Sequence, residues 1–132
     1  MRYLAGYLGA LAALAVLDAV WLGLVSREFY KARIGPLLLE QPVWSVALVF
    51  YLVHAAAIVV FPVSLAANGG SWLAALLWGA LFGFFTYAVY DLTNLATLRG
   101  WSVAVSLVDL AWGAVVTGIA ALASFLAMRA AS

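Results

Sequence analysis

Residues 72–98 read WLAALLWGALFGFFTYAVYDLTNLATL, an apolar run that contains a single charged side chain, Asp91. A helix rises about 1.5 Å per residue, so a run of this length can cross the roughly 30 Å hydrocarbon core of a bilayer. It is longer than a barrel strand, and it lacks the alternation of polar and apolar residues that such a strand requires. Residues 72–98 therefore predict a transmembrane helix.

Three further apolar runs flank this segment, at residues 3–25, 43–67 and 101–128. Asn68-Gly69-Gly70-Ser71 and Arg99-Gly100 are turn sequences between runs. Because such short connections make consecutive helices antiparallel neighbours, we expect an all-α, integral membrane, up-down four-helix bundle in a single domain. Pro62 lies within the second run and should kink that helix near one end.

The composition of the chain supports a membrane location and excludes several functions. Of its 132 residues, 69% are hydrophobic and 8% are charged, whereas about a quarter of the residues of a soluble domain are charged. The net charge of +1 provides no basic surface for nucleic acid. The chain has no cysteine, which excludes disulfides and thiolate metal sites, and one histidine cannot form a multi-histidine metal or haem site.

The N-terminal run raises the alternative of a cleaved signal peptide. Arg2 precedes the apolar residues, and Ala13-Leu14-Ala15 resembles a cleavage site. The run nevertheless continues to Val25, which is about the length that a membrane span needs. We therefore expect a retained transmembrane helix.

Residues 26–42 form the one long connection, and they mix apolar side chains with cations. Two interpretations remain equal: a short helix in the headgroup region, or an ordinary loop whose cations reach the membrane surface. In either case the side chains expected to contact headgroups on this face are Arg27, Lys31, Arg33 and Arg99.

The distribution of cations also bears on orientation. Four cations lie on the face of residues 26–42, and Arg2 and Arg129 lie on the opposite face. This difference favours a cytoplasmic position for residues 26–42. The N-terminal amine adds a positive charge to the opposite face and so reduces the difference in charge between the two faces. Insertion in both orientations therefore remains an alternative.

Three aspartates lie inside the apolar runs: Asp18, Asp91 and Asp109. Counted from the face of residues 26–42, they lie at a common depth of about 10–12 Å. Tyr51 falls at the same depth, and His54 lies one turn deeper. Three unpaired aspartates would cost on the order of 7–10 kcal/mol, and they cannot all be ionised without a cation among them. We therefore expect them to face one another, a cavity or a ligand.

Helical spacing aligns further polar residues with these acids. On the third run, Tyr87, Tyr90, Asp91 and Asn94 have the i, i+3, i+4, i+7 spacing of one helix face. The predicted binding layer comprises Asp18, Trp21, Tyr51, His54, Tyr87, Tyr90, Asp91, Asn94, Asp109 and Trp112. The alternative to a binding layer is a polar network that only joins the helices. This alternative suits Asn94 and His54 better than the acids, because Asn or Ser could join helices at a lower free-energy cost in the membrane than Asp. If a divalent cation is bound, its ligands would be Asp18, Asp91 and Asp109; no catalytic residue is indicated.

Several of these residues occur in strings that resemble a known family. The strings are Asp18-Ala-Val-Trp21-Leu, Phe29-Tyr30, Phe50-Tyr51, Gly83, Tyr87-Ala-Val-Tyr90-Asp91-Leu-Thr-Asn94-Leu-Ala-Thr-Leu, Trp101 and Asp109-Leu-Ala-Trp112-Gly113. Over nearly the whole chain they resemble the bacterial membrane family designated domain of unknown function 2177. The resemblance implies a multi-pass protein of four helices in the bacterial inner membrane, and it brings no assigned activity.

Three classes of function fit these observations, in this order. The first is a protein that binds or transports a cation, a proton or a small solute, as an oligomer because four helices enclose little volume. The second is a membrane enzyme acting on lipid near the headgroups, with the acids binding a divalent cation or serving as general acid and base. The third is an accessory subunit of a larger membrane complex that uses small-residue faces such as Gly79 and Gly83 for helix contacts.

Overall fold

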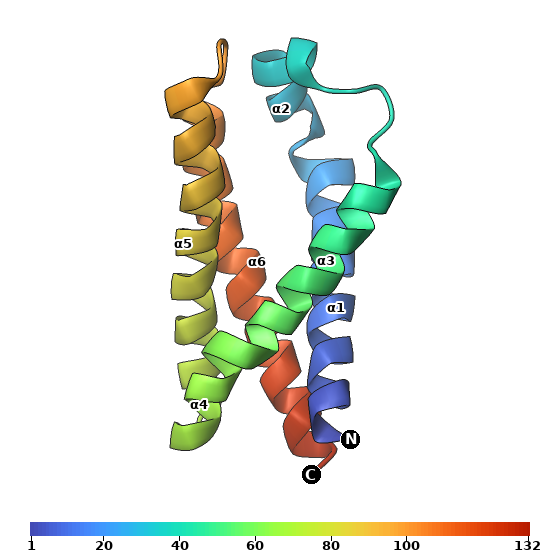
Figure 1. The fold of residues 1–132 in the computed structure, drawn as a ribbon, viewed down its shortest axis with the longest axis vertical. Helices are drawn as coiled ribbons and strands as arrows, with labels where there is room; N and C mark the ends of the chain where they lie inside the picture. The colour runs from blue at the N-terminus through green and yellow to red at the C-terminus, as the bar shows by residue number, and fades with distance from the viewer.

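Four helical stretches within the described part of the chain, residues 1–68 and 70–132, are long and apolar enough to cross a membrane. They are Arg2–Val25, Trp44–Asn68, Trp72–Thr97 and Val103–Ala130, and no strand occurs among those described residues. The computed structural model shows an up-down bundle with both termini at one end (Figure 1). The predicted all-α, four-helix membrane fold is therefore confirmed.

The first span changes its helical geometry near its end. Helix α1 (Arg2–Val20) continues into η1 (Trp21–Val25), a π-helical turn. The backbone N–H and the hydroxyl of Ser26 both donate to the carbonyl oxygen of Trp21, each at 2.8 Å. Short π-helical turns are rare and often occur at functional sites, because they change the direction in which side chains project.

A short helix connects the first two spans. Helix α2 (Arg27–Ile34) is followed by the 3₁₀ turn η2 (Gly35–Leu37). Figure 1 shows α2 at the end of the bundle opposite the termini. Of the two interpretations of residues 26–42, the structure contains the short helix.

The second span consists of α3 (Trp44–Ile58), η3 (Val59–Val63) and α4 (Ser64–Gly69). Pro62 lies inside η3, which is π-helical. Proline lacks a backbone donor and its ring displaces the preceding turn, which explains the wider hydrogen-bonding pattern at this point. Gly70 caps the C-terminus of α4, and its φ of 74° lies in the left-handed region that glycine tolerates best.

Helices α5 (Trp72–Thr97) and α6 (Val103–Ala130) complete the bundle. Each begins with a serine N-cap: the hydroxyl of Ser71 accepts from the N–H of Ala74, and that of Ser102 from the N–H of Val105. Helix α6 is the most buried span and packs against α5, α1 and α3. The other spans expose mainly apolar side chains, both aliphatic and aromatic, so they suit contact with lipid.

Glycines allow α5 and α6 to approach closely. A Cβ atom added at Gly83 would collide with the carbonyl oxygen of Gly113, and one added at Gly113 would collide with the ring of Tyr87. A Cβ atom at Gly79 would meet the Cβ atom of Ala121 at 2.5 Å. Small residues at such contacts are typical of membrane helices, where close backbone packing replaces the hydrophobic effect as the attraction between helices.

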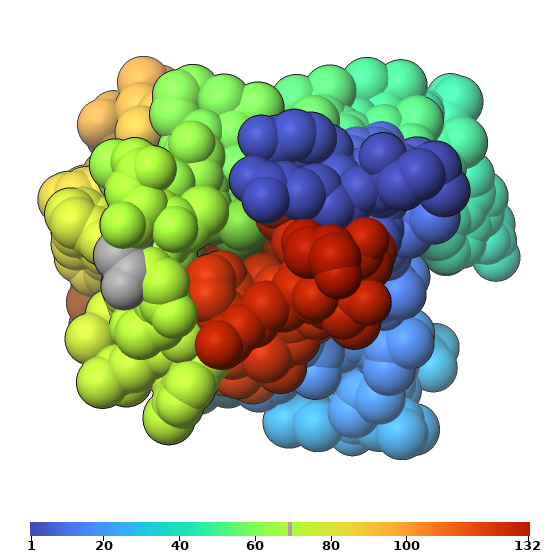
Figure 2. Space-filling model, turned by 90° about the horizontal axis from the view of Figure 1, so that it is seen from below, coloured from blue at the N-terminus to red at the C-terminus, as the bar shows by residue number. Residues whose placement is uncertain are grey.

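The second span meets α5 mainly near the termini end of the molecule. Helix α5 contacts η3 and α4, whereas α3 packs chiefly on α1 and α6. Figure 1 shows α3 leaning away from α5 toward the α2 end. Figure 2 views the molecule from the end that carries the termini, where the first residues, the last residues and the α4 region lie together. The bundle is therefore more open in the half that faces α2.

Candidate functional site

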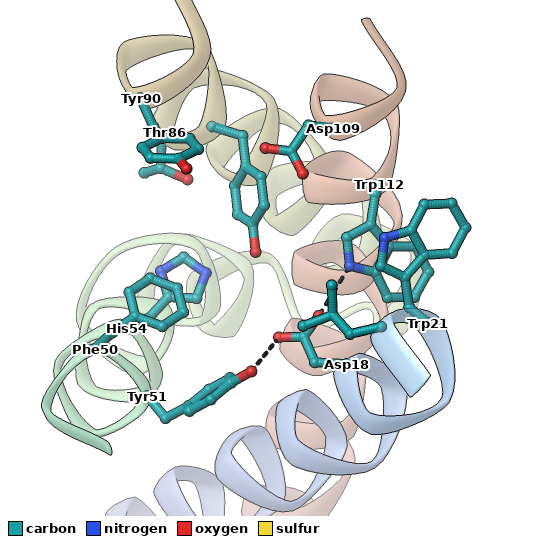
Figure 3. A pocket seen from close by; sticks show the side chains of 11 residues that line it. Asp18, Trp21, Phe50, Tyr51, His54, Thr86, Tyr90, Asp109 and Trp112 are labelled. Atoms are coloured by element: carbon teal, nitrogen blue, oxygen red, sulfur yellow. Dashed lines mark hydrogen bonds between the residues drawn. The ribbon is translucent and has the colours of Figure 1, made fainter. Parts of the chain in front are cut away.

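A cavity of about 470 Å³, which we name the main cavity, lies where the helices diverge. Its walls come from α1, η1, α3, α5 and α6. Its lining residues are Asp18, Trp21, Leu22, Phe50, Tyr51, His54, Thr86, Tyr87, Tyr90, Asp109 and Trp112. Every residue of the predicted binding layer is in this set except Asp91 and Asn94. Figure 3 shows the carboxyl groups of Asp18 and Asp109 on different sides of the cavity.

Asp18 joins three helices through its two carboxylate oxygens. The hydroxyl of Tyr51 donates to Oδ2 at 2.9 Å, and Nε1–H of Trp112 donates to Oδ1 at 2.9 Å (Figure 3). The side chain is only 6% exposed, so these charge-assisted bonds offset part of the cost of its burial. Each oxygen has a second lone pair, which leaves the carboxylate able to bind a further partner.

A second chain of contacts leads from Trp21 to Asp109. The indole of Trp21 stacks on that of Trp112 with ring centroids 4.5 Å apart, and its Nε1–H donates to the hydroxyl of Tyr30 at 3.2 Å. Tyr30 in turn donates to Oδ1 of Asp109 at 3.0 Å. Burial and the nearby charge of Asp109 raise the pKa of Tyr30, so the phenol remains a donor at neutral pH.

His54 is 5% exposed, and it both contributes to the cavity wall and packs in the core. Its ring lies parallel to that of Phe50, with centroids 5.2 Å apart. Nε2 lies 3.1 Å from the hydroxyl of Thr117 on α6. The contact with Thr117 satisfies one ring nitrogen, as expected for a histidine that helps to join two helices.

The remaining wall of the cavity is mostly aromatic, and no lysine or arginine is among its described lining residues. Two acids therefore face a space bounded by indole, phenol, phenyl and imidazole rings. Aromatic faces carry negative electrostatic potential, and together with carboxylates they attract cations. The arrangement can accommodate a positively charged group that also has apolar surface.

A second cavity of about 850 Å³ lies between α2, the following loop and the adjacent ends of α5 and α6. Of the predicted headgroup contacts, Arg27 and Lys31 line it. The guanidinium of Arg33 instead lies 4.0 Å from the ring centroid of Phe29, and Arg99 lines neither cavity. The two cavities share Leu22, Tyr90 and Asp109 as lining residues, so they adjoin.

The three aspartates do not form one metal site. Among the described residues, no group of three or more His, Cys, Asp or Glu side chains could hold a metal ion. Asp18 and Asp109 line the main cavity, but Asp91 is fully buried between α5 and α6. Asn94 is half-buried and lines neither cavity.

Four residues that contribute to the site were not in the predicted layer: Leu22, Tyr30, Phe50 and Thr86. Phe50 and Tyr30 belong to strings of the family resemblance, which was a usable signal. Leu22 likewise follows Trp21 in the string Asp18-Ala-Val-Trp21-Leu. Thr86 carries no charge and lies outside these strings, so nothing in the sequence distinguishes it from the other residues of its helix.

The fold and the cavity together define a small polytopic membrane protein with an acidic and aromatic pocket between its spans. The model of a family described as predicted membrane protein (DUF2177) matches residues 3–126, and the chain belongs to that family. Comparison with curated proteins and with solved structures gives no match. The resemblance noted from the sequence strings is thereby confirmed.

Proposed function

We propose that this membrane protein binds a small organic cation in the main cavity and carries it across the membrane. The observation that supports this most strongly is the lining of the cavity. Asp18 and Asp109 face a space of about 470 Å³ whose other walls are mostly aromatic, and no lysine or arginine is among the described residues that line it. A cationic ligand would supply the missing positive charge.

The chemistry of the walls favours an organic ammonium group over a metal ion. Hard metal ions such as Ca²⁺ take six to eight oxygen ligands, whereas the described residues that line this space include two carboxylates. The stacked indoles of Trp21 and Trp112 and the phenyl ring of Phe50 instead offer flat apolar surfaces. Cation–π attraction at a desolvated site is worth about 2 kcal/mol or more, so several rings add appreciably to the attraction of the acids.

The second cavity would provide the route of entry. It lies at the α2 end and adjoins the main cavity at Leu22, Tyr90 and Asp109. A ligand arriving from that face would meet Asp109 first. Asp18, which is more buried and is held by Tyr51 and Trp112, would receive the cation at the inner end of the path.

We further propose that the protein lies in the bacterial inner membrane with residues 26–42 on the cytoplasmic side. The support is the excess of cations on that face, four against two, and the positive-inside tendency of short loops. Reporter fusions distinguish the two orientations: a C-terminal alkaline phosphatase would be active and a C-terminal green fluorescent protein dark. The opposite result would reverse the proposed orientation.

The binding proposal is tested with protein in lipid nanodiscs and with radiolabelled choline as the cationic probe, read by scintillation proximity. Its uncharged isostere, 3,3-dimethylbutan-1-ol, has the same shape and lacks the charge. We expect saturable choline binding that the isostere fails to displace. Asp109→Asn should weaken binding, while Glu28→Gln, which changes an acid outside both cavities, should not.

Transport is tested separately in proteoliposomes loaded with buffer and exposed to labelled choline. Uptake should exceed that of empty liposomes and should fall in the Asp109→Asn variant. Binding without uptake would leave a cation-binding protein and remove the transport step from the proposal. Absence of both, or equal displacement by the isostere, would contradict the proposal.

A second candidate is a membrane enzyme that acts on lipid, and the second cavity is the observation that favours it. Arg27 and Lys31 could hold a lipid phosphate there, and Asp109, which lines the same cavity, could act as an acid or base. Mass spectrometry of lipids from cells that express the wild type or the Asp109→Asn variant tests this candidate. An unchanged lipid profile would count against it.

A further inference from the structure

We infer that Asp91 is a neutral carboxylic acid in the folded protein, and that it donates its proton as a hydrogen bond to the carboxylate of Asp109. Asp91 would then be a positioning residue for the acid that faces both cavities. The role of this bond in cation binding rests on the proposed function. The protonated state of Asp91 does not rest on it.

The packing of α5 against α6 places these two side chains opposite each other. Along the contact, Gly79 faces Ala121, and Tyr87 packs on Gly113. Asp91 lies one turn after Tyr87 on α5, and Asp109 lies one turn before Gly113 on the antiparallel α6. The same register therefore places Asp91 opposite Asp109 across the contact between α5 and α6.

The surroundings of Asp91 cannot support a negative charge. The residue is 0% exposed, and neither carboxylate oxygen has a hydrogen-bond donor among the described residues. A buried, unpaired carboxylate is among the costliest states for a side chain, and a second carboxylate in contact with it adds repulsion. Two ionised acids at this contact would have no donor between them.

One proton shared by the two acids removes the repulsion between their carboxylates. If Asp91 is protonated, its O–H donates to Asp109, and an O–H···O⁻ bond of this kind is short and strong. Protonation of Asp91 is preferred over protonation of Asp109 because Asp91 is sealed between the helices. Asp109 lines both cavities and already accepts a bond from Tyr30 at 3.0 Å, and both features favour its ionised form.

The other titratable groups around the pair do not replace this proton. They are Asp18 on α1, Tyr30 on α2, Tyr51 and His54 on α3, and Tyr87 and Tyr90 on α5. Tyr51 donates to Asp18, Tyr30 donates to Asp109, and the contact of His54 is with Thr117. Tyr87 and Tyr90 line the main cavity, and neither gives Asp91 a hydrogen bond in the described part of the chain.

Two hydrogen bonds, one from Tyr30 and one from Asp91, would hold the carboxylate of Asp109 in one orientation. Tyr30 donates to its Oδ1, and the proton of Asp91 would occupy a further lone pair. The lone pairs that remain would face the cavities. A neutral acid of this kind thus keeps a single negative charge at Asp109 and adds none in the α5–α6 contact.

Infrared difference spectroscopy of the wild-type protein in lipid at neutral pH tests the protonation state directly. A protonated carboxyl group has a C=O stretching band separate from carboxylate bands, and the band shifts on transfer to ²H₂O. We expect such a band in the wild type, in Glu28→Gln and in Asp109→Asn, and its loss in Asp91→Asn. No band in the wild type, or a band lost in Asp109→Asn and retained in Asp91→Asn, would overturn the inference.

Choline binding tests the positioning role. Asn at position 91 has the size of the neutral acid and can donate an N–H to Asp109, so Asp91→Asn should bind choline within about twofold of the wild type. Asp91→Val removes the donor and should weaken binding by about tenfold or more, which is about 1.4 kcal/mol. Equal binding by both variants would overturn the positioning role. If the wild type binds no choline, the proposed function fails and the infrared result still decides the state of Asp91.

Discussion

Replacement of Asp18 by Asn separates the charge of this residue from its hydrogen bonds. In the wild type, Tyr51 donates to one carboxylate oxygen and Trp112 to the other, both at 2.9 Å. An amide has one acceptor atom, its oxygen, and one donor group, its NH₂. The indole of Trp112 can only donate, so the amide oxygen must face Trp112, while the phenol of Tyr51 can turn and accept from the amide NH₂.

The expected cost to the fold is therefore small. Both contacts survive in neutral form, and what is lost is the extra strength of hydrogen bonds to a charged group. Hydrogen bonds between membrane helices average about 0.6 kcal/mol, and those to charged groups in proteins contribute about 1.5–3 kcal/mol. We expect Asp18→Asn to lower the free energy of unfolding by about 1 kcal/mol, which thermal unfolding in detergent can detect.

The expected cost to cation binding is larger. Removal of one partner from a desolvated charge pair typically costs about 2–5 kcal/mol, which corresponds to a loss of affinity of at least about thirtyfold. The assay is the equilibrium binding of labelled choline to nanodisc samples, with Glu28→Gln as the matched loss of an acid. If Asp18→Asn unfolds like the wild type and binds choline with unchanged affinity, Asp18 does not provide the counter-charge, and the reasoning is refuted.

Three further predictions concern the contact between α5 and α6, Tyr30 and Asp109. Gly83→Leu forces a side chain against the backbone of Gly113 and should cost about 1–3 kcal/mol in thermal unfolding, whereas Gly23→Ala, at a site with open space, should be nearly neutral. Burial raises the pKa of Tyr30, so its phenol should ionise at higher pH than exposed tyrosines, which titrate near pH 10. In an alkaline titration followed in the ultraviolet, Tyr30→Phe should therefore lose one phenol from the phase at higher pH and none from the phase near pH 10. Asp109→Asn should weaken choline binding by at least about thirtyfold, and an unchanged affinity would remove this acid from the site.

Much of the candidate site follows from the sequence because helix geometry is regular. The constant rise per residue places Asp18, Tyr51 and Asp109 at one depth, and the cost of acids in lipid requires them to turn inward. These residues do line one cavity. Trp112 lies one turn after Asp109 and also belongs to the predicted layer, and its indole donates to Asp18.

Other features depend on contacts between helices, which periodicity does not encode. Tyr30 belongs to α2 and reaches Asp109 only because that short helix packs over the ends of the spans. Asp91 shares a helix face with Tyr87, yet Asp91 is fully buried and does not line the cavity, whereas Tyr87 does. The π-helical turn that begins at Trp21 has no proline or other recognised signal in the sequence.

A structure of the protein determined in the presence of saturating choline tests the central claim most directly. We predict that the trimethylammonium group lies in the main cavity between Asp18 and Asp109, against the rings of its aromatic wall. A cavity filled by a lipid chain, or a choline molecule bound only elsewhere, would contradict the proposal that this pocket is an organic-cation site.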